Sequence, residues 1–155
     1  SKIKVLPGAE LTHIPLGQFQ PLAKYARKAG VKIIIGHGET PVEPVIKDTN
    51  RAALLSDINI LAHPGNITED DCLLAKKRGI FLELTARRGH CQGNIHVAKI
   101  AKNAKVNLVI NNDAHTPEDI IGMAELKKVA VSAGLSEAEI EELYAIEKRF
   151  LEKLI

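Results

Sequence analysis

Histidine and carboxylate residues recur directly after short apolar runs in this 155-residue sequence. Imidazole and carboxylate ligands without thiolate suit Zn, Mn or Fe, and the number of histidines is too high for a Mg or Ca cage. Two or more such ions held a few Å apart can lower the pKa of a bridging water and stabilise an in-line displacement at phosphorus. These residue types therefore predict a metal-dependent hydrolase site.

Four segments carry these side chains: Leu6-Pro7-Gly8-Ala9-Glu10, Ile35-Gly36-His37-Gly38-Glu39, Leu61-Ala62-His63-Pro64-Gly65 and Ile110-Asn111-Asn112-Asp113-Ala114-His115. Any one of these histidines alone is more often a hydrogen-bonded structural residue than a ligand. Their recurrence after successive runs, with Gly or Pro beside Glu10, His37 and His63 to let the chain bend, favours a common site. Asp113 and His115, two residues apart at a strand end, can point to the same side.

A fifth apolar run leads to Arg87-Arg88-Gly89-His90. Guanidinium groups at this position can hold a phosphate through forked hydrogen bonds. The alternative is that the two arginines are surface charge on a loop, and the sequence leaves both interpretations open.

The elements that must position these residues alternate between strands and helices, a pattern typical of parallel βα units. In such a sheet or barrel the carboxyl ends of all strands meet on one face, so the segments above become neighbours. Asn94 is expected to cap one helix, and the last helix is expected to pack through an apolar stripe. The expected strands are 3–6, 31–35, 58–62, 80–84 and 106–110; the expected helices are 18–29, 50–55, 68–78, 94–104, one that opens at Thr116-Pro117, and one from Ser136 to about Leu154.

The composition indicates which kinds of binding partner and which cellular compartment to expect. The net charge is +2 and aromatic residues are 3% of the chain, so neither a basic face nor stacking platforms for nucleic acid are expected. Cys72 and Cys91 are not a C-x-x-C pair, which favours a reducing, cytoplasmic setting. No apolar run reaches the ~20 residues of a membrane span, so no membrane association is expected.

Taken together, the ordered motifs resemble the polymerase-and-histidinol-phosphatase (PHP) family of metal-dependent phosphoesterases. The resemblance covers the chain up to its final helix and implies a single domain over residues 1–155, α/β in class, that is the C-terminal part of a distorted, TIM-like (β/α)₇ barrel. It also implies up to three Zn, Mn or Fe ions and a small phosphorylated substrate. The motifs that carry it are Pro7-Gly8-Ala9-Glu10-Leu11-Thr12-His13, His37-Gly38-Glu39, Glu43-Pro44-Val45, Asp48-Thr49-Asn50, Leu61-Ala62-His63-Pro64-Gly65 and Asn112-Asp113-Ala114-His115.

Carried over residue by residue, the resemblance assigns roles to five positions. Glu10 looks like the bridging glutamate, His37 and His63 like ligands of the second metal, Asp113 like a ligand of the first and His115 like a ligand of the third. Glu10, Asp113 and His115 are accordingly the candidate catalytic residues. The looser matches are candidates for lining the site or contacting phosphate: His13, Glu39, Arg87, Arg88 and His90.

The sequence departs from the family at its start, because no counterpart of the family's opening His-x-His segment occurs in these 155 residues. The domain is therefore expected to be N-terminally incomplete, to retain one metal, and to self-associate through open barrel edges. The alternative function is a non-catalytic PHP-like module that binds a metal or a partner. Exonuclease-like action on nucleic-acid ends is a further alternative, and the weak positive charge counts against it.

Overall fold

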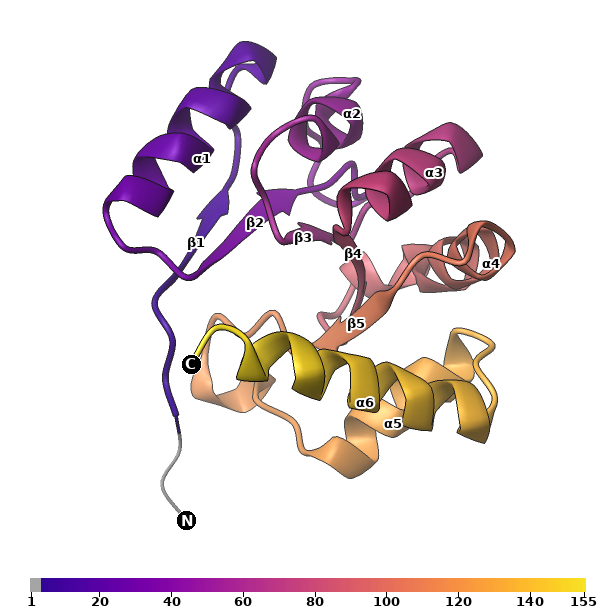
Figure 1. The fold of residues 1–155 in the computed structure, drawn as a ribbon. Helices are drawn as coiled ribbons and strands as arrows, with labels where there is room; N and C mark the ends of the chain where they lie inside the picture. Colours follow the sequence, from indigo (N-terminus) through magenta and orange to yellow (C-terminus); the bar gives the residue numbers. More distant parts are fainter. Residues whose placement is uncertain (1–3) are drawn as a thin grey trace.

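The protein is a parallel five-stranded sheet with helices on both sides, seen in a computed structural model that describes residues 4–155 (Figure 1). The strands lie in sequence order, each parallel to the next. They are β1 (Gly8–Leu11), β2 (Ile33–His37), β3 (Ile60–Ala62), β4 (Phe81–Thr85) and β5 (Leu108–Asn111). Within residues 4–155, β1 and β5 are the two edges of the sheet. The α/β class and the succession of parallel strands expected from the sequence are confirmed, and the order is compatible with a barrel-like fold.

The helices lie in two groups around the sheet. Figure 1 shows α1 to α4 fanned along one face, while α5 and α6 lie on the other side of β5. No helix among residues 4–155 is both long enough and apolar enough to cross a membrane. The helices are α1 (Phe19–Lys28), α2 (Thr49–Leu54), α3 (Glu69–Arg78), α4 (Asn94–Ala104), α5 (Met123–Ser132) and α6 (Glu137–Glu152), with 3-10 turns η1 (Leu16–Gln18), η2 (His90–Gly93) and η3 (Pro117–Asp119).

Alternation along the strands separates two apolar clusters. Ile34, Leu61 and Leu82 are fully buried on the face covered by α1 to α4, where the main core forms. The opposite, inner face carries a smaller cluster of Ile60, Phe81 and Val109. The inner cluster packs against α6 through Ile146 and Phe150, with the Phe81 and Phe150 rings 4.8 Å apart. The stripe predicted on the last helix therefore does pack against the sheet.

The first strand lies later in the chain than the sequence suggests. Residues 4–7 form no strand, Ile3 lies outside the described residues, and Val5 is 86% exposed. Instead Gly8 to Leu11 pair with β2, because this register buries Leu11 against the helices. Glu10 is consequently inside a strand rather than after one, and the other four strands also start one or two residues later than expected.

Two helix starts also differ from expectation. Thr116-Pro117 opens only the single turn η3, closed by a capping box with Asp119, and α5 begins later at Met123. Asn94 does not cap α4, because its side chain pairs with the backbone of Thr85 at the end of β4: Oδ1 accepts from the Thr85 N–H at 3.2 Å and Nδ2 donates to its carbonyl at 2.9 Å. Asn94 thus fixes a strand end rather than a helix end.

The packing of α6 on the inner face predicts a clear stability difference between two aromatic residues. Phe150→Ala should lower the free energy of unfolding by about 2 kcal/mol, below the range for fully buried Phe because Phe150 is half-buried. Tyr25→Ala, at a position that is 72% exposed on α1, should change it by less than about 0.5 kcal/mol. Urea unfolding of both variants measures this, and equal losses would contradict the placement of α6.

Candidate metal centre

Five potential metal ligands meet at the carboxyl ends of the strands. Glu10 lies in β1, His37 ends β2, His63 follows β3, His90 opens η2 after β4, and Asp113 follows β5. In the first group, here called the Glu10 trio, one ligand atom each of Glu10, His37 and His63 lies within 4.8 Å of the others. In the second, the Asp113 trio, the same holds for His63, His90 and Asp113. The two trios share His63.

His63 is at the middle of this arrangement. Its Nε2 lies 4.0 Å from Glu10 Oε1 and 3.6 Å from Asp113 Oδ2. The ring of His63 is 4.4 Å from that of His37 and 4.6 Å from that of His90, between centroids. Both carboxylates can therefore contribute an oxygen next to the same imidazole nitrogen.

The three imidazoles are buried and neutral. Burial is the main cause that lowers the pKa of His37, His63 and His90, and it brings that of His63 to about 3. The neutral ring is the form that binds a metal. One buried nitrogen on each ring, namely His37 Nε2, His63 Nδ1 and His90 Nδ1, has no hydrogen-bond partner among residues 4–155. Such unsatisfied nitrogens cost free energy that a bound ion near them can offset.

The tautomer of His37 follows from its surroundings. Its Nδ1 lies 3.0 Å from the carbonyl oxygen of Gly38, which can only accept, so Nδ1 carries the hydrogen. The lone pair is then on Nε2, the nitrogen without a partner. A backbone carbonyl that fixes a ligand in this way is a common outer partner of metal-binding histidines. Nε2 of His37 is therefore available as a ligand atom in the site.

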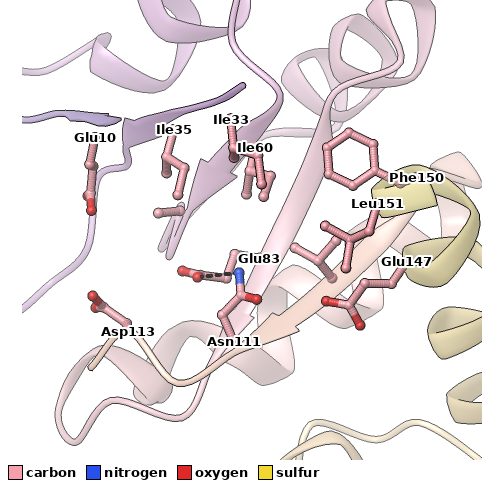
Figure 2. A pocket seen from close by; sticks show the side chains of 12 residues that line it. Glu10, Ile33, Ile35, Ile60, Glu83, Asn111, Asp113, Glu147, Phe150 and Leu151 are labelled. Atoms are coloured by element: carbon pink, nitrogen blue, oxygen red, sulfur yellow. Dashed lines mark hydrogen bonds between the residues drawn. The ribbon is translucent and has the colours of Figure 1, made fainter. Parts of the chain in front are cut away.

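The carboxylates of Glu10 and Asp113 place negative charge close together in the site. Burial first, and the Asp113 carboxylate second, raise the pKa of Glu10. The side chain of Asp113 is only 10% exposed and that of Glu10 is 31% exposed. Figure 2 shows both carboxylates directed into the same space at the strand ends. Because two carboxylates in a partly dry site repel each other, a divalent cation between them is the natural counter-charge.

The chain adopts unusual backbone conformations at three candidate residues. His13, His63 and Asp113 have positive φ angles of 51°, 27° and 50°, a region that costs free energy for residues other than Gly. For His63 the conformation is held by Glu83, whose Oε2 accepts the His63 backbone N–H at 3.0 Å. The strained residues thus coincide with the site.

Glu83 is a functional-site residue that the sequence reasoning missed. It is 3% exposed in the middle of β4, and its second oxygen, Oε1, accepts from Asn111 Nδ2 at 3.0 Å. Burial raises its pKa to about 7. The signal available in the sequence was a single charged residue within the apolar run Phe81-Leu82-Glu83-Leu84. Alternation directs it to the inner face, where Figure 2 shows it beside Asn111.

The loops after β2 and β3 are tied together by Asn50. Its Oδ1 accepts from the Glu39 backbone N–H at 2.9 Å and its Nδ2 donates to the Pro64 carbonyl at 2.8 Å. Glu39 in turn accepts the Asn50 backbone N–H at 3.0 Å, so its carboxylate points to the start of α2 rather than to the trios. A Cβ on Gly38 would lie 2.3 Å from the Ala62 carbonyl oxygen, so only Gly permits the close approach that brings His37 and His63 together.

Glu43, on the loop after β2, is a second residue that sequence reasoning did not single out as functional. Its Oε1 lies 3.0 Å from His13 Nε2, and its Oε2 lies 3.7 Å from His37 Nε2 and 3.8 Å from His90 Nε2. Hydrogen bonding from His13 is the main cause that lowers its pKa. His13, 54% exposed, therefore lies at the rim, bonded to this carboxylate and with its ring 5.7 Å from that of His37.

The two arginines differ in position. Arg87 Nη1 lies 3.4 Å from Asp113 Oδ2 and 3.2 Å from His115 Nε2, at the edge of the Asp113 trio. His115 itself is 56% exposed and belongs to neither trio. Arg88 is exposed, and no hydrogen bond or ion pair of its side chain occurs within residues 4–155. Arg87 is thus the arginine placed to contact a ligand of the centre.

A cavity of about 280 Å³ continues from the carboxylates into the inner face of the sheet. Figure 2 shows Glu10, Glu83 and Asp113 at one end, with isoleucines of β2 and β3 and the end of α6 around the rest. Glu147 on α6 also lines it, and burial raises the pKa of this carboxyl to about 7. The cavity is therefore largely apolar with ionisable groups at both ends.

Similar sequences are found in several microorganisms. A protein of Methanocaldococcus jannaschii, described as uncharacterized, is 46% identical over 140 residues, which cover 90% of this chain and 64% of that protein. Proteins named probable phosphatase from Thermoanaerobacter sp. (strain X514) and Thermoanaerobacter pseudethanolicus are each 31% identical over 91 residues, 52% of this chain and 37% of theirs. No established family profile matches the chain.

Solved structures share the fold. A chain in the cryo-EM structure of archaeal ribonuclease P with mature tRNA aligns with a TM-score of 0.78 and 20% identity, over 99% of this chain and 70% of that one. A crystal structure of an amidohydrolase aligns with a TM-score of 0.62 and 14% identity, over 84% of this chain and 35% of that one. At these identities the similarity shows a common α/β architecture. The chain also spans less than two thirds of the length of the relatives it matches in sequence.

The bond from His63 to Glu83 predicts a graded response to substitution. Glu83→Ala should lower the free energy of unfolding by about 3 kcal/mol, because it leaves a buried N–H unsatisfied and opens a cavity. Glu83→Gln keeps an acceptor and resembles the protonated carboxyl, so it should cost about 1 kcal/mol. Urea unfolding and the amide resonance of His63 are the measurements. Equal losses for the two variants, or a His63 amide unchanged in Glu83→Ala, would contradict this role; exposed Glu118→Ala is the control.

Proposed function

We propose that this protein is a metal-dependent phosphoesterase that acts on a small phosphorylated molecule. The observation that carries the proposal is the convergence of two overlapping imidazole–carboxylate trios with Arg87 at their edge. The distant relatives named probable phosphatase support the same class of reaction. A metal centre beside a guanidinium group is the arrangement that phosphoryl chemistry uses to bind and neutralise charged oxygens.

The fold that goes with this function is the C-terminal part of a distorted (β/α)₇ barrel of the PHP type. The sequential parallel order of β1 to β5 and the placement of all candidate ligands at the carboxyl ends of the strands support it. In parallel α/β sheets and barrels this end is where active sites are built. The amidohydrolase alignment supports a barrel-like architecture for the sheet.

The residues of the chain divide into three tasks. Glu10, His37 and His63 would hold the ion, for which Zn, Mn or Fe fits the nitrogen and oxygen donors. Such an ion supplies a Lewis acid for phosphoryl oxygens and a lowered pKa for an attacking water. Asp113 Oδ2, beside both His63 and Arg87, is placed to orient that water or to hold its proton. Arg87 would bind the phosphate oxygens.

The cavity next to the centre indicates the size of the substrate. Its volume of about 280 Å³ and its isoleucine lining suit a small organic group whose phosphate remains at the strand ends. No aromatic platform for a stacked base lines it except Phe150, whose ring packs on Phe81. These features favour a small phosphoester over a nucleic-acid end.

The proposal predicts that the metal-loaded chain binds inorganic phosphate and that the two arginines differ. Arg87→Ala should weaken phosphate binding by about tenfold or more, because it removes a charge-assisted hydrogen bond. Arg88→Ala, the matched control, should change it by less than about twofold. Calorimetric titration of the Zn-loaded and Mn-loaded protein with phosphate measures both.

Hydrolysis of an activated aryl phosphate is tested in parallel, before and after treatment with a chelator. Slow, metal-dependent release of phosphate is expected. Phosphate binding should be better retained than ester hydrolysis, since the chain spans 64% of the Methanocaldococcus jannaschii protein. Failure of the metal-loaded protein both to bind phosphate and to hydrolyse the ester would overturn the proposed function.

A further inference from the structure

His90 stands out among the histidines because the fold buries it without giving it a hydrogen bond. Its side chain is 5% exposed, and Nδ1 has no partner within residues 4–155. Its Nε2 lies 3.8 Å from Glu43 Oε2, which is beyond hydrogen-bonding distance. A buried imidazole nitrogen without a partner is unfavourable unless something binds it.

The chain brings His90 to this place through a close backbone contact. η2, which begins at His90, ends at Gly93, and a Cβ at Gly93 would lie 3.2 Å from the Cα of Gly65. Gly65 follows His63 by two residues, so the small residues let the loop after β4 pack against the loop after β3. As a result the rings of His63 and His90 lie 4.6 Å apart.

Asp113 completes the surroundings of His90 from the third direction. Ligand atoms of His63, His90 and Asp113 all lie within 4.8 Å of one another, and the Asp113 side chain is 10% exposed. Two imidazoles and one carboxylate form a three-ligand protein shell of the kind found in open zinc sites. The donors come from three separate loops that the sheet holds in fixed positions.

We infer that His63, His90 and Asp113 form a second metal position beside the Glu10 trio, and that the two positions are alternatives. The inference rests on the proposed metal centre and assigns His90 as a ligand in it. A neutral imidazole gives one lone pair to one ion, so the shared His63 cannot serve both trios at once. The protein therefore binds one ion in either trio, and an ion in the Asp113 trio lies at the side of the centre where Arg87 meets Asp113.

Affinities for Zn²⁺ and Co²⁺, measured by competition with a chelator, test the inference in three single variants of the 155-residue chain. His37→Ala leaves the Asp113 trio intact, and His90→Ala leaves the Glu10 trio intact, so each should keep one ion with a loss of less than about tenfold. His63→Ala breaks both trios and should lose the ion. If only the Glu10 trio binds, His37→Ala will lose the ion as completely as His63→Ala, which overturns the inference.

The role of His90 is isolated in the His37→Ala background. There, adding His90→Ala should weaken binding at least about tenfold more, since loss of a ligand exceeds the 10–100-fold typical for loss of an outer partner. Adding His96→Ala, on α4, whose Nε2 lies 2.8 Å from the Ile67 carbonyl oxygen and which belongs to neither trio, should have little effect. Equal effects of the two additions would overturn the assignment of His90.

A measurement on the unmodified chain removes the dependence on variants that fold poorly. In a long-range ¹H–¹⁵N spectrum of the imidazole groups, Zn²⁺ should shift a ring nitrogen of His90 as well as those of His37 and His63. An unchanged His90 ring at saturating Zn²⁺ would overturn the inference. These measurements report ion binding and not catalysis. A protein that binds the ion in either trio but does not hydrolyse phosphoesters would therefore refute the proposed function and leave this inference standing.

Discussion

The bond between the His63 backbone N–H and the buried Glu83 carboxylate is the interaction on which the candidate site depends. His63 belongs to both trios, and its φ of 27° is a conformation that the chain adopts only under constraint. Glu83 supplies that constraint from inside β4, where Asn111 of β5 holds its other oxygen. Three neighbouring strands thus fix one imidazole, and the ligands on both sides of it take their positions relative to that ring.

The convergence of the candidate ligands could be predicted from the sequence because parallel strands impose a simple geometry. When each apolar run ends in a His or a carboxylate, the topology alone places those residues together. The sequence could not predict Glu83 or Glu43, because their contacts join residues from different strands and loops. It also misplaced the first strand, since pairing with β2 decides the register and the local run 3–6 has no partner. Asn94 differs for the same reason, because its side chain hydrogen-bonds the backbone at the end of β4 rather than at the start of α4.

The charge balance of these groups explains why the site would favour a bound cation. Burial lowers the pKa of the three imidazoles, so they give no positive charge to Glu10 and Asp113. Besides the neutral His63 ring, Arg87 and the exposed His115 lie within 4 Å of the Asp113 carboxylate. Glu10 has its pKa raised by burial and by Asp113. The site is therefore short of positive charge, which is the condition that favours a divalent ion.

The apolar part of the cavity connects this charge argument to function. Water entering a site lined by Ile33, Ile35 and Ile60 finds few hydrogen-bond partners, so the space next to the carboxylates favours an organic group over solvent. α6 closes the far side through Phe150, and burial raises the pKa of its Glu147 carboxyl to about 7, so this group is only partly ionised near neutral pH. Strong electrostatics at one end and weak hydration at the other would bind the phosphate and the organic part of a phosphoester by different forces. In the proposed phosphoesterase, binding and turnover would then respond separately to substitution, since the candidate ligands at the strand ends would act on the phosphate alone.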